Sequence, residues 1–150
     1  MYEEYLTKAL VGIINAKQAL KNYEDTGIKD LKNTAAYNIQ QAIEFILKHE
    51  IYNCEMYNHG NENVKQIFSH NLDSLIKDYC EPFQLCIPDK IVKNAKLYTS
   101  WEAESRYSLG FSVRIDSLKA AIKMTEMWLV QITPGYKKKL QQVNKRLGFL

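Results

Sequence analysis

Polar side chains gather on one predicted helix of this chain, namely Gln40 and Gln41 with Glu44 and Lys48. Glu44 follows Gln41 by three residues and precedes Lys48 by four, so the three side chains share one helical face. An amide, a carboxylate and an ammonium group at this spacing can stabilise one another through a hydrogen bond and an ion pair. The pattern therefore predicts a structural network, and it leaves open a ligand- or partner-binding surface at Gln41 and Glu44.

A second polar cluster lies just before Gly110 and contains Glu102, Glu104, Arg106 and Tyr107. The guanidinium of Arg106 can bind a phosphate or a carboxylate through two parallel hydrogen bonds. It can equally pair with Glu102, four residues earlier on the same helix face. Arg106 and Tyr107 are therefore candidate binding residues, with an internal ion pair as the alternative.

His70 is the one histidine that the sequence offers for acid–base work. It stands at a predicted helix start, where a histidine acts either as a cap or packing residue or as a proton carrier. Metal-independent RNA cleavage would need such a group together with a cation on the phosphate, and Arg106 could supply that cation. If the protein is catalytic at all, His70 and Arg106 are the residues to test.

Metal and cofactor chemistry find little support in the sequence. The three histidines lack the close helical spacing of zinc ligands, and the three cysteines form no C-x-x-C pair. The glycine-rich phosphate loops of nucleotide-binding folds are absent from the sequence. We expect no metal and no cofactor, and the odd number of cysteines is typical of a reducing cytoplasm.

These residues must be positioned by helices, because apolar residues recur at steps of three and four along the chain. Only three prolines and six glycines interrupt the pattern. The sequence predicts an all-α protein, an up-and-down antiparallel bundle of four to five main helices with an added C-terminal basic helix. The predicted helices cover approximately residues 2–23, 31–52, 72–79, 115–132 and 136–147, with a fourth helix that starts at 88 and ends between 101 and 107.

Several local signals set the boundaries of these helices. Asp25-Thr26-Gly27 should end the first helix, and the second should fray within Asn53–Asn63, which is rich in asparagine. Val64–Phe68 is short enough to be extended. Ser69-His70-Asn71 suits a helix N-cap, and Pro88 suits the start of the fourth helix.

The helix over Ile115–Ile132 has the strongest pattern. Its apolar residues form a near-heptad, and further apolar residues widen the apolar arc, which predicts contact with two neighbouring helices or with a second subunit. The seam consists of Ile115, Leu118, Ile122, Thr125, Leu129 and Ile132, flanked by Ala121, Met124 and Trp128.

The charge of the chain is uneven. The net charge is +3, yet the last seventeen residues carry five basic side chains and no acid. These are Lys137, Lys138, Lys139, Lys145 and Arg146. Such a tail either faces water or contacts phosphate or an acidic partner.

The size and hydropathy of the chain fit one soluble domain over residues 1–150. No apolar run approaches the roughly 20 residues of a membrane span, and the N-terminal Met1-Tyr2-Glu3-Glu4 is acidic where a signal peptide would be basic. We expect a cytoplasmic protein without a membrane partner.

Three segments, in order, resemble the HEPN family. Ala35–Glu44 resembles its A-x(3)-QQA-x-E helix, Ser69–Leu75 its H-[DN]-L-x-x-L segment, and Glu104–Tyr107 the acidic-R-Y element before its last long helix. The resemblance covers residues 3–132, and residues 133–150 are an added basic amphipathic helix. Phe45 stands where a lysine is common in the family, which argues against anion binding on that helix face.

The resemblance implies a helical bundle, often a homodimer, that acts in toxin–antitoxin or defence systems through RNA cleavage or nucleotide binding. It also implies a small nucleotidyltransferase as a frequent partner. Ribonucleases of the family carry R-x(4–6)-H, but here every arginine follows every histidine, so the motif is absent. Our first hypothesis is a non-catalytic protein that binds a nucleotide, RNA or a partner protein, with Arg106 and Tyr107 near a dimer interface. The alternatives are a ribonuclease toxin that uses His70 and Arg106, and a structural module that dimerises through Ile115–Ile132.

Overall fold

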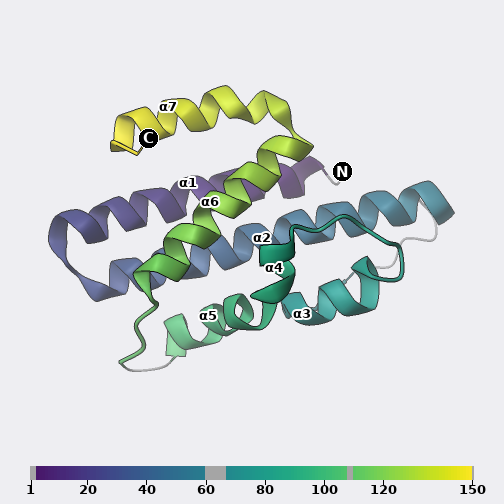
Figure 1. The fold of residues 1–150 in the computed structure, drawn as a ribbon, viewed down its shortest axis with the longest axis horizontal. Coiled ribbons are helices and arrows are strands. Elements are labelled where there is room, and N and C mark those ends of the chain that lie inside the picture. The colour runs from purple at the N-terminus through teal and green to yellow at the C-terminus, as the bar shows by residue number, and fades with distance from the viewer. Residues whose placement is uncertain (1–2, 60–66, 108–109, 150) are drawn as a thin grey trace.

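The computed structural model describes residues 3–59, 67–107 and 110–149, with side chains given except at 55–59, 106 and 107. All regular elements in these residues are helical, so the prediction of an all-α bundle is confirmed. The long helices α1 (Glu3–Thr26) and α2 (Lys29–His59) run antiparallel beside each other (Figure 1). Gly27 ends α1 as predicted, since its φ of 71° is readily adopted by glycine and its N–H donates to the Tyr23 carbonyl at 2.7 Å.

Helices α1 and α2 approach each other closely where both have small residues. A Cβ atom added to Gly12 of α1 would lie 3.1 Å from the Ala42 Cβ and 3.1 Å from the Asn38 carbonyl oxygen of α2. Ala42, the small residue of α2 at this contact, is completely buried, as are Ala35 and Ala36, so α2 admits the backbone of α1 at this point.

A group of short helices covers one side of this pair. It comprises α3 (Leu72–Leu75), which continues as the π-helix η2 (Ile76–Cys80), α4 (Asp89–Lys93) and α5 (Ala95–Tyr107). Asn71 caps α3 as predicted, with its side-chain oxygen accepting from the Ser74 N–H at 3.1 Å. His70, two residues before α3, contacts Glu44 of α2, and α5 also packs on α2.

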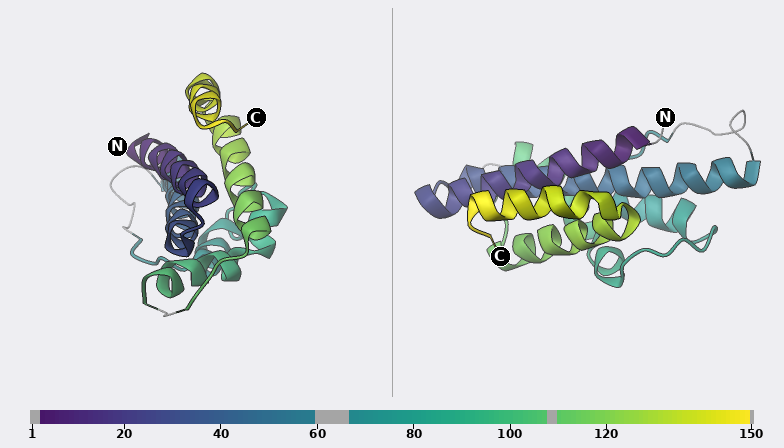
Figure 2. Two further views of the ribbon diagram at one scale, coloured as in Figure 1. Left: turned by 90° about the vertical axis from the view of Figure 1, so that its left-hand side faces the viewer. Right: turned by 90° about the horizontal axis from the view of Figure 1, so that it is seen from above.

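Helix α6 (Ile115–Ile132) crosses the α1–α2 pair obliquely, with the bounds that the sequence predicted (Figure 1). A 3₁₀ turn, η3 (Pro134–Tyr136), leads from α6 into α7 (Lys137–Leu147). Figure 2 shows α7 on the side of the molecule opposite to α3–α5. The C-terminal basic helix therefore packs on the bundle as a further element.

The apolar seam of α6 is used inside the protein. Leu118 and Leu129 are completely buried, and Ile122 is 5% exposed. The helix contacts both α1 and α2, so the first of the two predicted explanations, contact with two neighbouring helices, accounts for its wide apolar arc. An interface between subunits would have to use other residues than these three.

Two boundaries differ from the sequence-based expectation. Helix α2 continues through Asn53 to His59 instead of fraying, because Ile51 and Tyr52 are buried and Tyr52 stacks on Tyr5 at 5.7 Å between ring centroids. Burial of such side chains outweighs the small helix penalty of asparagine. The fourth helix is divided at Asn94, whose side chain donates to the Lys90 carbonyl at 2.8 Å and ends α4.

Residues 60–63 of the expected fray, and 64–66 of the segment expected to be extended, lie outside the described residues. The two remaining residues of that segment, Ile67 and Phe68, have no regular structure. Ile67 is nevertheless fixed to α2, since it is buried and its N–H donates to the Tyr52 hydroxyl.

Candidate functional site

The predicted polar cluster of α2 forms around the Glu44 carboxylate. Gln40, Glu44 and Lys48 follow one another at four-residue steps, and all three are buried. The Lys48 Nζ lies 3.2 Å from Glu44 Oε2, and the two side chains are 8% and 5% exposed. A buried carboxylate is stable only with such partners, so the ion pair with Lys48 is what allows Glu44 to be buried on this helix.

His70 completes this cluster from outside the helix. Its ring Nδ1 lies 3.0 Å and 3.1 Å from the two Glu44 oxygens, while 61% of its side chain remains exposed. Gln40 holds the same residue through its backbone, with Nε2 donating to the His70 carbonyl at 3.4 Å. When Nδ1–H donates to a carboxylate, the neutral imidazole has its unprotonated Nε2 free to accept a proton, so the geometry orients His70 as a weak base.

Helix α5 fixes the position of this segment. The Leu72 N–H donates to the Thr99 hydroxyl oxygen at 2.9 Å, and that hydroxyl donates to the Ala95 carbonyl at 2.8 Å. The start of α3, directly after His70, is therefore tied to α5 as well as to α2.

Gln41 does not belong to the cluster, contrary to the predicted network. It lies beside Thr7, Lys8 and Gly12 of α1 in a groove of about 270 Å³, and the described residues include no hydrogen bond from Gln41 to Glu44. The physical reason is that α2 turns by about 100° per residue, so neighbouring glutamines face different helices. Gln40 faces α3, and Gln41 faces α1.

Arg106 and Tyr107 are the last two residues of α5, and their side chains lie outside the described residues. The alternative pairing of Arg106 with Glu102 falls outside them as well. Along the backbone, Arg106 is seven residues from Thr99, about 10 Å or two helical turns, on the same face of the helix. The structure therefore brings Glu44, Lys48 and His70 together, and it places the backbone of Arg106 on the neighbouring helix.

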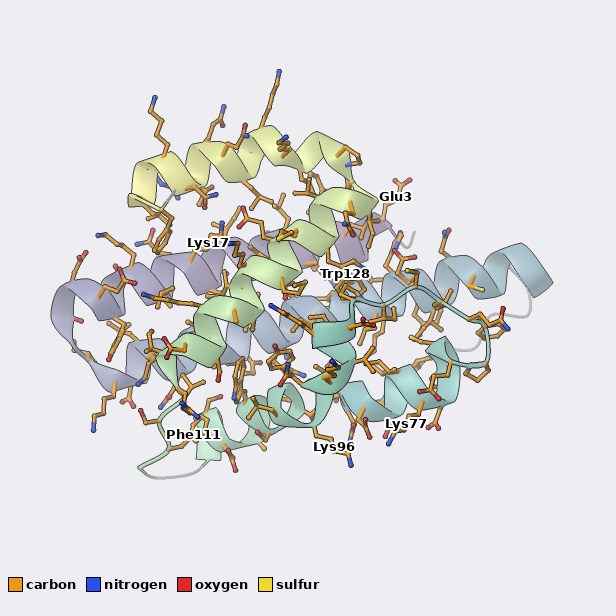
Figure 3. The ribbon with its side chains drawn as sticks, in the orientation of Figure 1. Glu3, Lys17, Lys77, Lys96, Phe111 and Trp128 are labelled. Atoms are coloured by element: carbon orange, nitrogen blue, oxygen red, sulfur yellow. The ribbon has the colours of Figure 1, made fainter. Side chains whose placement is uncertain are left out.

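A second ion network, absent from the sequence-based expectations, joins α1, α6 and α7. The Lys17 ammonium contacts Glu126 and Asn144, and the Asn144 side chain donates to Glu126 Oε1 at 3.2 Å. Lys17 is 5% exposed at its side chain, and Figure 3 shows it beneath α7. The sequence contains one indication of this network, because Lys17 lies within the apolar stripe of α1, four residues after Ile13.

All the charged residues on the outer face of α7 are basic. All five of its cations are exposed, and no acid pairs with them among the residues described. On a helical wheel they occupy an arc of about 200° centred opposite the buried Leu140 and Leu147. Side chains of α7 project outward from the bundle in Figure 3. The five cations are Lys137, Lys138, Lys139, Lys145 and Arg146.

The cysteines show no sign of nucleophilic use. Cys54, Cys80 and Cys86 form no disulfide. Burial, with a smaller contribution from nearby Glu50, raises the pKa of the Cys80 thiol to about 12, which keeps it protonated. Across residues 3–59, 67–107 and 110–149, no three His, Cys, Asp or Glu side chains gather in a way that could hold a metal ion.

Comparisons with known proteins give no match to a family model, to a curated protein or to a solved structure. None of the helices in the described part of the chain combines the length and the apolar character needed to cross a membrane. We therefore infer the function from the geometry of the chain itself.

Proposed function

We propose that this chain is a non-catalytic HEPN-like protein that binds RNA through the basic face of α7. The observation that carries the proposal is the concentration of five exposed cations, without an acid, on one helix face. A basic stripe of this kind is the electrostatic footprint of a nucleic-acid-binding surface. The remainder of the chain, with 15 basic and 17 acidic residues, offers no comparable excess of positive charge.

The spacing of the cations favours RNA over a free nucleotide. Lys137 and Arg146 are nine residues apart, which separates them by about 13 Å along the helix axis. A mononucleotide carries its phosphates at one end, whereas a polynucleotide presents a phosphate at every step along its backbone. A row of cations of this length is therefore best matched by several successive phosphates.

The HEPN part of the proposal is supported by a contact between two of the resembling segments. Glu44 ends the first segment and His70 lies in the second, and their side chains meet at 3.0 Å. In this proposal the pair is structural, because it fixes the turn between α2 and α3. Membership in a toxin–antitoxin or defence system, a homodimer and a small nucleotidyltransferase partner belong to the same proposal.

Fluorescence anisotropy with a labelled single-stranded RNA tests the binding surface. If all five cations contact phosphates, the slope of log Kobs against log salt concentration should approach about −3.5. Replacement of Lys137, Lys138 and Lys139 by Gln should weaken binding and reduce this slope by about 2. These side chains are exposed, so the fold should be unaffected.

The matched control replaces three exposed lysines of α4 and α5 by Gln, namely Lys90, Lys93 and Lys96. It changes the net charge by the same amount but leaves α7 intact. Equal loss of RNA affinity in both triple variants would show a non-specific charge effect and refute the assignment to α7.

The second candidate function is a ribonuclease with a non-standard site. The observation in its favour is that Glu44 orients the exposed His70 ring, as the acid–base partner of such an enzyme would require. Wild-type protein should then cleave labelled RNA, and His70→Ala and Arg106→Ala should each abolish cleavage. The absence of cleavage by the wild type, at concentrations that saturate RNA binding, would exclude it.

A further inference from the structure

A polar cavity of about 540 Å³ lies where the start of α1, the C-terminal third of α2 and the end of α6 meet. Two carboxylates, Glu3 and Glu50, line it, and no lysine or arginine does. The other titratable groups facing it are His49 and Tyr136. The cavity is therefore negatively charged within a protein of net positive charge.

Two buried polar atoms of this cavity lack hydrogen-bond partners. Within the part of the chain that the structure describes, neither His49 Nδ1 nor Thr133 Oγ1 has one. The nearest carboxylate oxygen to His49 Nδ1, Oε1 of Glu50, is 3.9 Å away and too distant for a hydrogen bond. Native proteins rarely leave such atoms unsatisfied, so a water molecule or a ligand is needed to complete this cavity.

A second cavity, of about 420 Å³, adjoins the first along Glu50 and Ile132, which line both. Its wall is mostly apolar and contains Leu85, Met124 and Trp128. Glu3 and Trp128, which border the polar and the apolar cavity respectively, are labelled in Figure 3. The two neighbouring cavities thus have an acidic lining and a mostly apolar lining, and Glu50 belongs to both.

We propose that these cavities bind a small organic cation, a protonated primary amine on an apolar body. An ammonium group has three donors and no acceptor, which suits the Glu50 carboxylate together with the unpartnered His49 Nδ1 and Thr133 Oγ1. The apolar body fits against Met124 and Trp128, and a ring there gains from the aromatic face. Anions are repelled by the two carboxylates, and a neutral analogue forgoes the charge-assisted hydrogen bond.

Titration calorimetry and tryptophan fluorescence with 2-phenylethylamine, compared with the neutral 2-phenylethanol, test the proposal. The amine should bind with a dissociation constant in the millimolar range or below, and the alcohol at least tenfold more weakly. Glu50→Gln preserves the shape of the side chain and should weaken amine binding at least tenfold. Thr133→Val, which removes only the hydroxyl, should weaken it to a smaller extent.

Glu24→Gln is the matched control, since Glu24 lines a different cavity, between α1 and α6, and should leave amine binding unchanged. Circular dichroism and thermal melting establish that each variant is folded. Thr133→Val keeps the test decisive if Glu50→Gln fails to fold. Equal binding of amine and alcohol, unchanged amine binding in the folded cavity variants, or no binding of amine up to about 10 mM would overturn the proposal. In the last case, water satisfies the two unpartnered atoms.

Discussion

Breaking the buried ion pair of α2 should destabilise the protein far more than breaking an exposed pair of the same spacing. Glu44 and Lys48 are four residues apart, with a distance of 3.2 Å and side chains 5% and 8% exposed. Lys21 and Asp25 of α1 are also four residues apart, at 3.3 Å, but are 36% and 57% exposed. Burial is therefore the main difference between the two pairs.

The expected magnitudes follow from these distances. With an effective dielectric constant of about 20, the attraction within the buried pair is about 5 kcal/mol, whereas in water the exposed pair gains about 1 kcal/mol. Desolvation cancels much of the first value, but removal of one partner leaves an uncompensated buried charge. We expect Glu44→Gln to cost about 3 kcal/mol of unfolding free energy.

Lys48→Met should cost less, about 1 to 2 kcal/mol, because His70 still contacts Glu44. The double variant should be no less stable than Glu44→Gln alone, since the unpaired ammonium is gone. The coupling free energy is therefore at least about 1 to 2 kcal/mol, against less than about 0.5 kcal/mol for Lys21→Met with Asp25→Asn.

Urea denaturation of all six variants and the wild type, monitored by circular dichroism, gives these free energies if the m-values are unchanged. A coupling free energy for Glu44 and Lys48 as small as that of the exposed pair would refute the argument that burial makes this ion pair important.

Three further predictions concern other buried groups. Cys86 is exposed, whereas the raised pKa of Cys80 lowers its thiolate fraction by about a thousandfold. A thiol reagent at pH 8 should therefore label Cys86 and spare Cys80 until the protein unfolds. Mass spectrometry that finds both cysteines labelled at equal rates would contradict this. The same pKa shift implies that the free energy of unfolding decreases as the pH rises from about 9 to 12, because the unfolded chain loses the Cys80 proton while the folded one keeps it. Thermal melting of Cys80→Ala should therefore depend less on pH in this range. The difference in unfolding free energy is at most about 1.4 kcal/mol per pH unit. Asn33→Ala should lower the free energy of unfolding by about 2 to 3 kcal/mol in urea denaturation. The reason is that the buried Asn33 side chain accepts from the Val113 N–H at 3.1 Å and donates to the Phe111 carbonyl at 2.7 Å. A loss below about 0.5 kcal/mol would show that water replaces the side chain.

Helix positions were largely predictable because they depend on local spacing. Ile115–Ile132 was located to the residue by its apolar repeat, and Gly27 and Asn71 act as the terminating and capping residues that their types suggest. The extension of α2 to His59 was not predictable, since it depends on the stacking of Tyr52 on Tyr5, which is 47 residues away in the sequence.

The candidate site was predictable only in part. The sequence identified Glu44 and His70 as polar residues of interest, but their contact joins residues 26 positions apart and depends on how α3 packs on α2. It assigned the amide of the cluster to Gln41 instead of Gln40, because spacing along one helix does not reveal which neighbour each face meets. The Lys17 network and the acidic cavity at Glu50 arise where three helices converge, and no single helix contains that information.

The sequence by itself thus determined the helical class, the order of the elements, and the charge of the C-terminal helix, all of which follow from residue type and local periodicity. Tertiary structure alone decided which buried polar groups found partners from outside their own helix. Glu44 obtained His70 in addition to its helix neighbour Lys48, whereas His49 Nδ1 and Thr133 Oγ1 obtained no partner. The physical reason is that a buried charge or hydrogen-bonding group is stabilised by atoms brought to it from distant parts of the chain, and local spacing does not specify those atoms.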